Sequence, residues 1–155
     1  IQTAPAESTG IEQAEGSELV AAVLNYENDL LSKLAETEAA NDIMDVHYAY
    51  NNLIEFYYKY REASKEYFDK AIFYCQKDVI LFPTLKPLFM ADLQMIPRIP
   101  AFQRLAMLYD QRGEYEKAIE ICGLGIKYDL ADGTQGGFRA RRERIEKKLI
   151  EAQNA

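Results

Sequence analysis

Apolar residues recur at intervals of three and four along most of the chain, which is the spacing of one face of a helix. The clearest stretch runs from Arg98 to Asp132. Its periodic positions are Phe102, Leu105, Ala106, Tyr109, Gly113, Tyr115, Ala118 and Gly125. These spacings predict two antiparallel helices. The pattern as a whole predicts an all-α protein.

A second helical hairpin is predicted over residues 42–83. Asn41 and Asp42 can cap its first helix. The second helix is expected from about Ser64 to Phe82 and should stop at Pro83, because proline lacks an amide hydrogen and clashes with the preceding turn. The apolar stripe of the first helix comprises Ile43, Val46, Tyr50, Leu53, Tyr57 and Tyr60.

The two hairpins differ in the length of their turns. Tyr50 corresponds to Phe102 at an offset of 52 residues, whereas Ala71 corresponds to Ala118 at an offset of 47 residues. The earlier hairpin therefore carries five extra residues, around positions 60–67, and its turn should be longer.

Four segments surround the hairpins. Residues 1–16 have few large apolar residues and the composition of a linker. A leading helix capped by Ser17 is predicted to run to about Ala40 and to cover the first hairpin. Residues 84–97 hold apolar residues between prolines, which predicts a short insertion helix. This helix should widen the angle or spacing between the hairpins or lie across one end of a groove, and Pro100 suits the first turn of the next helix. Residues 135–153 predict a capping helix.

The hairpin over residues 98–132 resembles a tetratricopeptide repeat, in which small residues stand where two helices touch and aromatic residues where they interlock. The resemblance implies a single right-handed helical repeat domain over residues 17–155, with about seven helices. The earlier hairpin departs from the family's pattern at two positions. Ile54 stands where Gly or Ala is preferred and Asp78 where Ala is preferred, so its helices should pack less closely.

The resemblance also implies a function. In this family the first helices of the hairpins line a concave groove that binds peptides, so we expect a non-catalytic protein or peptide interaction module. The groove positions that match are Asn51, Asn52, Glu55, Tyr58 and Lys59 in the earlier hairpin and Gln103, Arg104, Met107 and Asp110 in the later one.

Two groove residues suit ligand binding, and each also has a simpler role. Tyr58 can stack on a ligand while its hydroxyl forms a hydrogen bond, or it can pack against the leading helix or the insert. Arg104 offers a planar fork to a carboxylate, and tetratricopeptide domains that capture the C-terminal carboxylates of chaperones use Asn and basic residues on such faces. Pro100 stands where that clamp would need Lys. A salt bridge of Arg104 with Glu55 or Asp110 is the alternative.

The net charge of −7 argues against non-specific nucleic-acid binding, which depends on Lys and Arg. Residues 1–45 contain ten acidic residues and only Lys33, whereas residues 136–155 contain six basic residues and three Glu. These are either solvated helix faces or docking surfaces for charged partners. No apolar run approaches the ~18 residues of a membrane span, so we expect a soluble protein without a membrane partner.

Cys75 and Cys122 follow the same Lys-Ala-Ile sequence in the two hairpins and so occupy equivalent helix positions. Packed helices lie roughly 10 Å apart, which is too far for a disulfide. We expect buried, reduced thiols, which favour a reducing compartment and a cytoplasmic location. With two Cys and one His, no metal site of familiar spacing can form, and no cofactor is expected.

The sequence offers no catalytic arrangement. His47 is the only histidine and has no nucleophile beside it, and no two carboxylates pair in an apolar setting. Gly133, Gly136 and Gly137 could receive an anion before a helix, but they lack a phosphate-loop pattern and are better explained as a turn and cap. We therefore predict that the protein is not an enzyme.

Two other functions are compatible with the sequence. The chain begins at Ile1 and has no signal-peptide pattern, so we expect it to be a piece of a longer or processed protein. It could then be a structural or self-association module whose groove is filled by its own N-terminal segment. A regulatory repeat domain that senses a small molecule is the other alternative.

Overall fold

A computed structural model describes residues 6–155, with side chains from Gly16 onward, and over that part of the chain it contains six helices and no strand. The all-α class is therefore confirmed. No helix in this part has an apolar stretch of the length that a membrane crossing requires. The helices are α1 (Ala6–Ala39), α2 (Ile43–Lys59), α3 (Lys65–Leu93), α4 (Pro100–Gln111), α5 (Tyr115–Lys127) and α6 (Gly137–Gln153).

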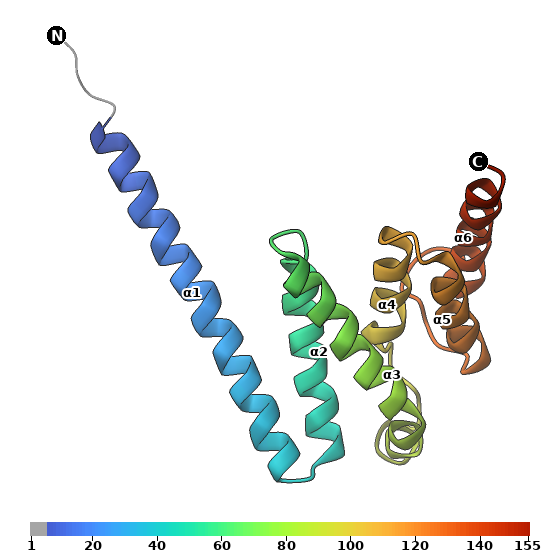
Figure 1. Cartoon of the computed structure of the whole chain (residues 1–155). Helices are drawn as coiled ribbons and strands as arrows, with labels where there is room; N and C mark the ends of the chain where they lie inside the picture. Colours follow the sequence, from blue (N-terminus) through green and yellow to red (C-terminus); the bar gives the residue numbers. More distant parts are fainter. Residues whose placement is uncertain (1–5) are drawn as a thin grey trace.

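The helices follow one another in space in the order of the chain (Figure 1). Each helix packs against the next, and α2 also contacts α4. The α2–α3 and α4–α5 pairs are the two predicted hairpins. Helices α1 and α6 consequently lie at opposite ends of the molecule.

Helix α1 begins earlier than predicted. Ser17 was expected to cap it, but the helix starts at Ala6, so most of the predicted linker over residues 1–16 is helical; residues 1–5 lie outside the described part. Ala, Glu and Gln favour helix even without large apolar neighbours, which is why a composition typical of a linker is helical here. The first half of α1 extends beyond the end of α2 (Figure 1).

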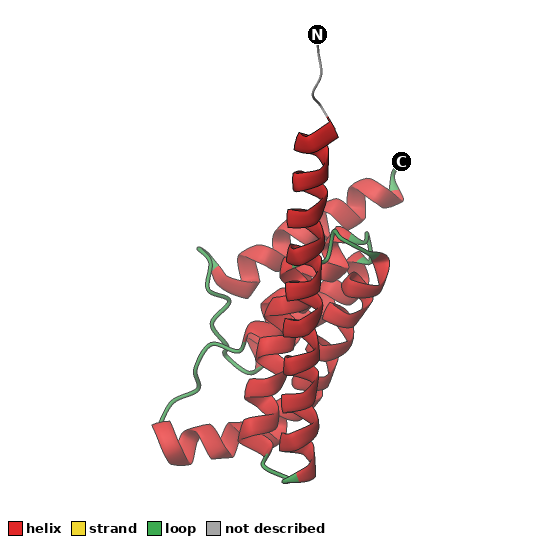
Figure 2. Ribbon diagram, turned by 90° about the vertical axis from the view of Figure 1, so that its left-hand side faces the viewer, coloured by secondary structure: helices red, strands yellow, loops and turns green. Residues whose placement is uncertain are grey.

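Helix α3 does not stop at Pro83. It continues to Leu93 through Pro83 and Pro87, so the predicted insertion helix is its second half and the helices number six rather than seven over the described residues. Both views show it changing direction along its length (Figures 1 and 2). Proline bends a helix by removing a hydrogen bond. Leu85 and Phe89, both fully buried, offset that cost by filling the core.

The predicted helix starts are confirmed where the signal is local. The Asp42 side chain accepts a hydrogen bond from the Asp45 amide at 3.0 Å, and the Ser64 hydroxyl accepts one from the Tyr67 amide at 3.1 Å. Pro100 occupies the first turn of α4. In the α4–α5 turn, Gly113 has φ of 75°, a conformation that favours glycine.

The five extra residues of the earlier hairpin are divided between its turn and its second helix. Five residues, 60–64, join α2 to α3, whereas three, 112–114, join α4 to α5. Helix α3 also starts three residues before the counterpart of the first residue of α5. The longer turn was thus predicted correctly.

One continuous core runs through the helices. Ala71 and Ala118, at the predicted positions of close contact, are fully buried. Cys75 and Cys122 are also fully buried and are free thiols, as expected. Burial raises the pKa of Cys75 well above its ordinary value and that of Cys122 to about 11. Both thiols therefore remain protonated and unreactive near neutral pH.

Candidate functional site

The residues predicted for the groove meet where α2 and α4 lie side by side. The Arg104 guanidinium forms two hydrogen bonds with the Glu55 carboxylate, Nε to Oε1 at 3.0 Å and Nη2 to Oε2 at 2.9 Å. This is the salt bridge that the sequence offered as the alternative to a carboxylate clamp. The pair is partly exposed, with 23% of the Arg104 side chain and 48% of the Glu55 side chain accessible. It joins the two helices through a planar, bidentate contact.

Tyr58 supports this pair from beneath and is not an exposed platform for a ligand. Only 9% of the residue is accessible. The guanidinium carbon of Arg104 lies 4.1 Å from its ring centroid and that of Arg61 lies 3.9 Å away. Both guanidinium groups therefore make cation–π contacts with the Tyr58 ring. The Tyr58 hydroxyl points to the Met107 sulfur at 3.7 Å, so Tyr58 packs against α4 rather than against α1 or the second half of α3.

Arg61 is a member of this cluster that the sequence did not reveal. Its Nε donates to the Gln111 side chain at 3.0 Å, and its Nη1 donates to the Tyr58 carbonyl at 2.8 Å near the end of α2. A basic residue just after a helix is a common cap, which was the available signal. Its reach to α4 depends on tertiary packing.

Two predicted groove residues point elsewhere. Gln103 is 6% accessible, and its side-chain oxygen accepts a hydrogen bond from Arg98, which also donates to the Asp132 carbonyl at 3.3 Å. Asn51 is half-buried, and its Nδ2 lies 3.3 Å from Nε2 of His47. Both residues therefore belong to the interior rather than to a binding surface.

The remaining predicted residues stay on the surface. Asn52 and Lys59 are exposed on α2, and Lys59 lies 5.3 Å from the Tyr60 ring centroid. Asp110 on α4 pairs with Lys148 of α6 at 2.9 Å. We call this surface the α2–α4 face; it comprises Asn52, Glu55, Lys59, Arg104, Met107 and Asp110.

The only histidine is in the core. His47 is 2% accessible, and its Nδ1 lies 2.7 Å from Oδ1 of Asp78, which is fully buried. Burial raises the pKa of Asp78, while its hydrogen bond to His47 acts in the opposite direction. Asp78 Oδ2 and Asn51 Oδ1 have no hydrogen-bond partner among the described residues. The pair stabilises the contact of α2 with α3 and has no surface from which to meet a substrate.

A buried carboxylate also fixes α1 to the first hairpin. Glu27 accepts hydrogen bonds from the hydroxyls of Tyr57 at 2.6 Å and Tyr67 at 2.9 Å, and Lys70 lies 3.5 Å away. Burial alone would raise the pKa of Glu27, but the tyrosines and Lys70 outweigh it and lower the pKa. Sequence reasoning missed this cluster, because Glu27 looked like one more residue of an acidic helix face.

The loop before α6 is held by a second buried ion pair. Arg141 Nε donates to Oδ1 of Asp132 at 2.8 Å, and Asp132 is 2% accessible. Gly133, Gly136 and Gly137 have φ of 90°, 83° and 65°. These are the conformations of the turn and cap predicted for them.

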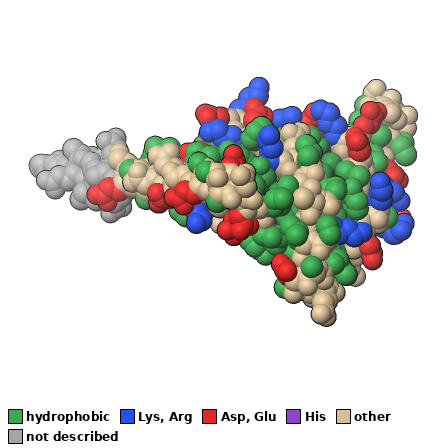
Figure 3. Space-filling model, turned by 90° about the horizontal axis from the view of Figure 1, so that it is seen from below, with side chains coloured by type: hydrophobic (Ala, Val, Ile, Leu, Met, Phe, Trp, Pro, Cys, Tyr) green, Lys and Arg blue, Asp and Glu red, His purple; other side chains and the backbone are tan. Residues whose placement is uncertain are grey.

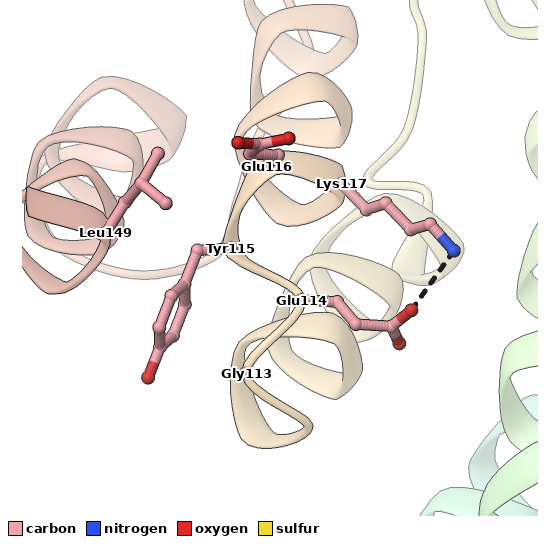
Figure 4. A pocket seen from close by; sticks show the side chains of 6 residues that line it. All are labelled: Gly113, Glu114, Tyr115, Glu116, Lys117 and Leu149. Atoms are coloured by element: carbon pink, nitrogen blue, oxygen red, sulfur yellow. Dashed lines mark hydrogen bonds and ion pairs between the residues drawn. The ribbon is translucent and has the colours of Figure 1, made fainter. Parts of the chain in front are cut away.

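Several hollows lie away from the α2–α4 face, among them two at the α4–α5 hairpin. One, of about 310 Å³, is lined by the α4–α5 turn and α6. Figure 4 shows Leu149 on one side of it. The side chains of Lys117 and Glu114, an ion pair at 3.0 Å, point away from Leu149. The other, of about 390 Å³, lies between α3, α4 and α5, and we call it the α3–α5 cleft. It is lined by Gln76, Val79, Ile80, Leu105, Tyr109, Lys117, Glu120 and Ile121.

Neither metal chemistry nor a known relative assigns a function. The described residues contain no group of three or more His, Cys, Asp or Glu that could hold a metal ion. Comparison with known proteins gave no match to a protein-family model, a curated protein or a solved structure. The function is therefore argued from the geometry alone.

Proposed function

We propose that the chain is a right-handed helical repeat domain of the tetratricopeptide type and acts as a non-catalytic interaction module for a protein or peptide. The observation that carries the proposal is the Glu55–Arg104 pair, placed over Tyr58 on an exposed surface shared by α2 and α4. The two helices are first helices of successive hairpins, which is where the resemblance puts the binding surface.

The α2–α4 face suits a partner that carries both charges and apolar groups. Arg104 is held in a fixed orientation, so a partner's carboxylate can exchange with Glu55 at little entropic cost. Lys59 and the amide of Asn52 are exposed beside the pair, and Met107 adds an adaptable apolar contact. We assign no cofactor or catalytic step to this face, and we place the protein in the cytoplasm on the basis of its two buried thiols.

The proposal is tested by exchanging the two charges. Glu55→Lys combined with Arg104→Glu keeps an ion pair across α2 and α4 but inverts the charges that a partner meets. Partners recovered by affinity capture with the wild-type chain, and identified by mass spectrometry, should be lost, because like charges would then face each other. Circular dichroism and thermal unfolding should stay close to wild type, since an exposed pair contributes little stability.

A matched exchange supplies the control. Lys33→Glu with Glu36→Lys inverts an exposed pair on α1, outside the α2–α4 face, and should leave capture unchanged. Equal recovery of the same partners by the Glu55/Arg104 exchange would show that binding uses another surface.

A further inference from the structure

The first half of α1 carries an apolar stripe that nothing in the described chain covers. Glu27 and Leu34 are buried against the first hairpin, and Val20 precedes Glu27 by two helical turns on the same side. Val20 is 59% accessible, Leu19 67% and Leu24 47%. Figure 3 shows this part of α1 extending from the body with hydrophobic and acidic side chains on it.

The α3–α5 cleft exposes a second apolar surface on its α3 wall, whereas Leu105 and Tyr109 at its base are buried. Leu105 and Tyr109 of α4 form its floor, and its α3 wall includes Ile80, which at 76% is the most accessible large apolar residue among those described. Phe73, two turns earlier on the same side of α3, is 47% accessible. A groove with one helix at its base and one helix on each side has the shape in which a partner helix can lie.

The charges of the two surfaces differ in sign by a small margin. Of the eight acidic residues of α1, Glu18 alone lies within residues 16–24, which contain no basic residue. Lys117 lines the α3–α5 cleft, and Lys77 stands one turn from Phe73, with its ammonium 5.2 Å from the ring centroid. Glu120 is an acidic residue on the same rim. An acidic, apolar helix therefore suits this cleft better than it suits a second acidic α1.

The helix cannot reach the cleft of its own molecule. Glu27 ties α1 to Tyr57 and Tyr67, and its uncovered half points away from α3, α4 and α5 (Figure 1). We propose that residues 16–24 of one copy dock into the α3–α5 cleft of a second copy. Reciprocal docking gives a closed dimer, and one-way docking gives a chain of copies.

Docking leaves the α2–α4 face free. Leu105 and Tyr109 point into the cleft, whereas Arg104, Met107 and Asp110 lie on the opposite side of α4, as their positions around the helix require. Self-association and the proposed partner binding therefore use different surfaces and can fail independently.

The test is sedimentation velocity on the full chain at rising concentrations. Wild type should form larger species as the concentration rises, and Leu24→Glu or Ile80→Glu should each raise the dissociation constant at least about tenfold, since each buries a charge in an apolar contact. Both residues are exposed in the single chain, so folding should be unaffected. Ile150→Glu, at an equally exposed position on α6, is the matched control and should associate like wild type.

Disulfide cross-linking tests the pairing directly. Mixing Leu24→Cys with Ile80→Cys chains under mild oxidation should give a cross-linked dimer that neither variant forms alone to the same extent; Cys75 and Cys122 are buried and should not compete. A wild-type chain that stays monomeric at all concentrations would overturn the proposal. Association that is lost in Leu24→Glu but kept in Ile80→Glu would overturn the cleft as the docking site.

Discussion

At the residue scale, the His47 cluster shows how a polar group is tolerated in the core. Nδ1 of His47 and Oδ1 of Asp78 share a hydrogen bond at 2.7 Å, and the Asn51 amide nitrogen lies 3.3 Å from Nε2. The histidine on α2 thus provides a hydrogen-bond partner for the buried acid on α3. Removing one partner of such a pair lowers the folding stability much more than removing both partners together.

We predict that His47→Leu lowers the free energy of unfolding by about 3–5 kcal/mol, because it leaves the Asp78 carboxylate buried without a donor. The double variant His47→Leu/Asp78→Ala should lose much less than the sum of the two single variants. Urea denaturation of the four chains measures this coupling. Additive losses would show that the two side chains act independently.

Glu27 should make stability depend on pH in the acid range. Its folded pKa is lowered below the ordinary value of 4.5, so its contribution is fully present above that value and is lost as the pH falls through the folded pKa. Glu27→Gln should cost about 1–3 kcal/mol at pH 7, because buried hydrogen bonds to a charge are weakened.

Unfolding of wild type and Glu27→Gln by urea at pH 7, 5 and 3 checks this prediction. The difference in stability between the two chains should shrink as the pH falls below about 4.5. Glu36→Gln, which alters an exposed carboxylate on the same helix, should change stability little at pH 7. A difference that is constant with pH would exclude the proposed role of the Glu27 charge.

At the scale of elements, the second half of α3 belongs to the core despite its prolines. Leu85 and Phe89 are fully buried, and the Phe89 ring meets the His47 ring edge to face at 5.4 Å. The bend at Pro83 and Pro87 directs this half under α2 instead of letting it continue into solvent. Helix propensity alone therefore misjudges the segment.

We predict that Phe89→Ala lowers the free energy of unfolding by about 3–5 kcal/mol, as expected for a large cavity in a packed core. Met90→Ala changes the next residue, which is 46% accessible, and should cost less than about 1 kcal/mol. Thermal or urea unfolding of both variants compares them. A small change in the free energy of unfolding for Phe89→Ala would mean that this half of α3 contributes little to the core.

Signals that are local in sequence predicted the elements well. The cap at Asp42, the helix start near Ser64 and the position of Pro100 in the first turn of α4 depend on a few neighbouring residues, and they were predicted. The continuation of α3 through Pro83 depends on the burial of Phe89 by distant helices, which the local pattern does not contain. The same holds for the candidate site.

Within the site, the spacing placed Glu55 and Arg104 on facing helix surfaces, and the structure pairs them. The spacing did not show that the Gln103 side chain turns toward Arg98. Neighbouring residues point about 100° apart around a helix, so an error of one position changes the predicted direction of a side chain. Glu27 was missed because its partners lie 30 and 40 positions away. Polar contacts between residues far apart in the sequence were thus the main features that the sequence did not predict.

At the scale of the whole molecule, the linear order of the helices separates the acidic start from the basic end. Helices α1 and α6 lie at opposite ends (Figure 1), so their charges can meet only between molecules. The prediction that Leu24→Glu and Ile80→Glu weaken association belongs to this scale. It depends on two surfaces that no single hairpin possesses.

The attachment of α1 also has a mechanical consequence. From Ala6 to Glu27 the helix is about 30 Å long, at 1.5 Å per residue, so it behaves as a lever whose pivot is the Glu27 carboxylate. A sideways pull at the tip acts through that long arm on the hydrogen bonds from Tyr57 and Tyr67. A partner that binds the tip therefore exerts force on the α2–α3 hairpin directly, through the Glu27 hydrogen bonds and the apolar contacts of Leu30 and Leu34.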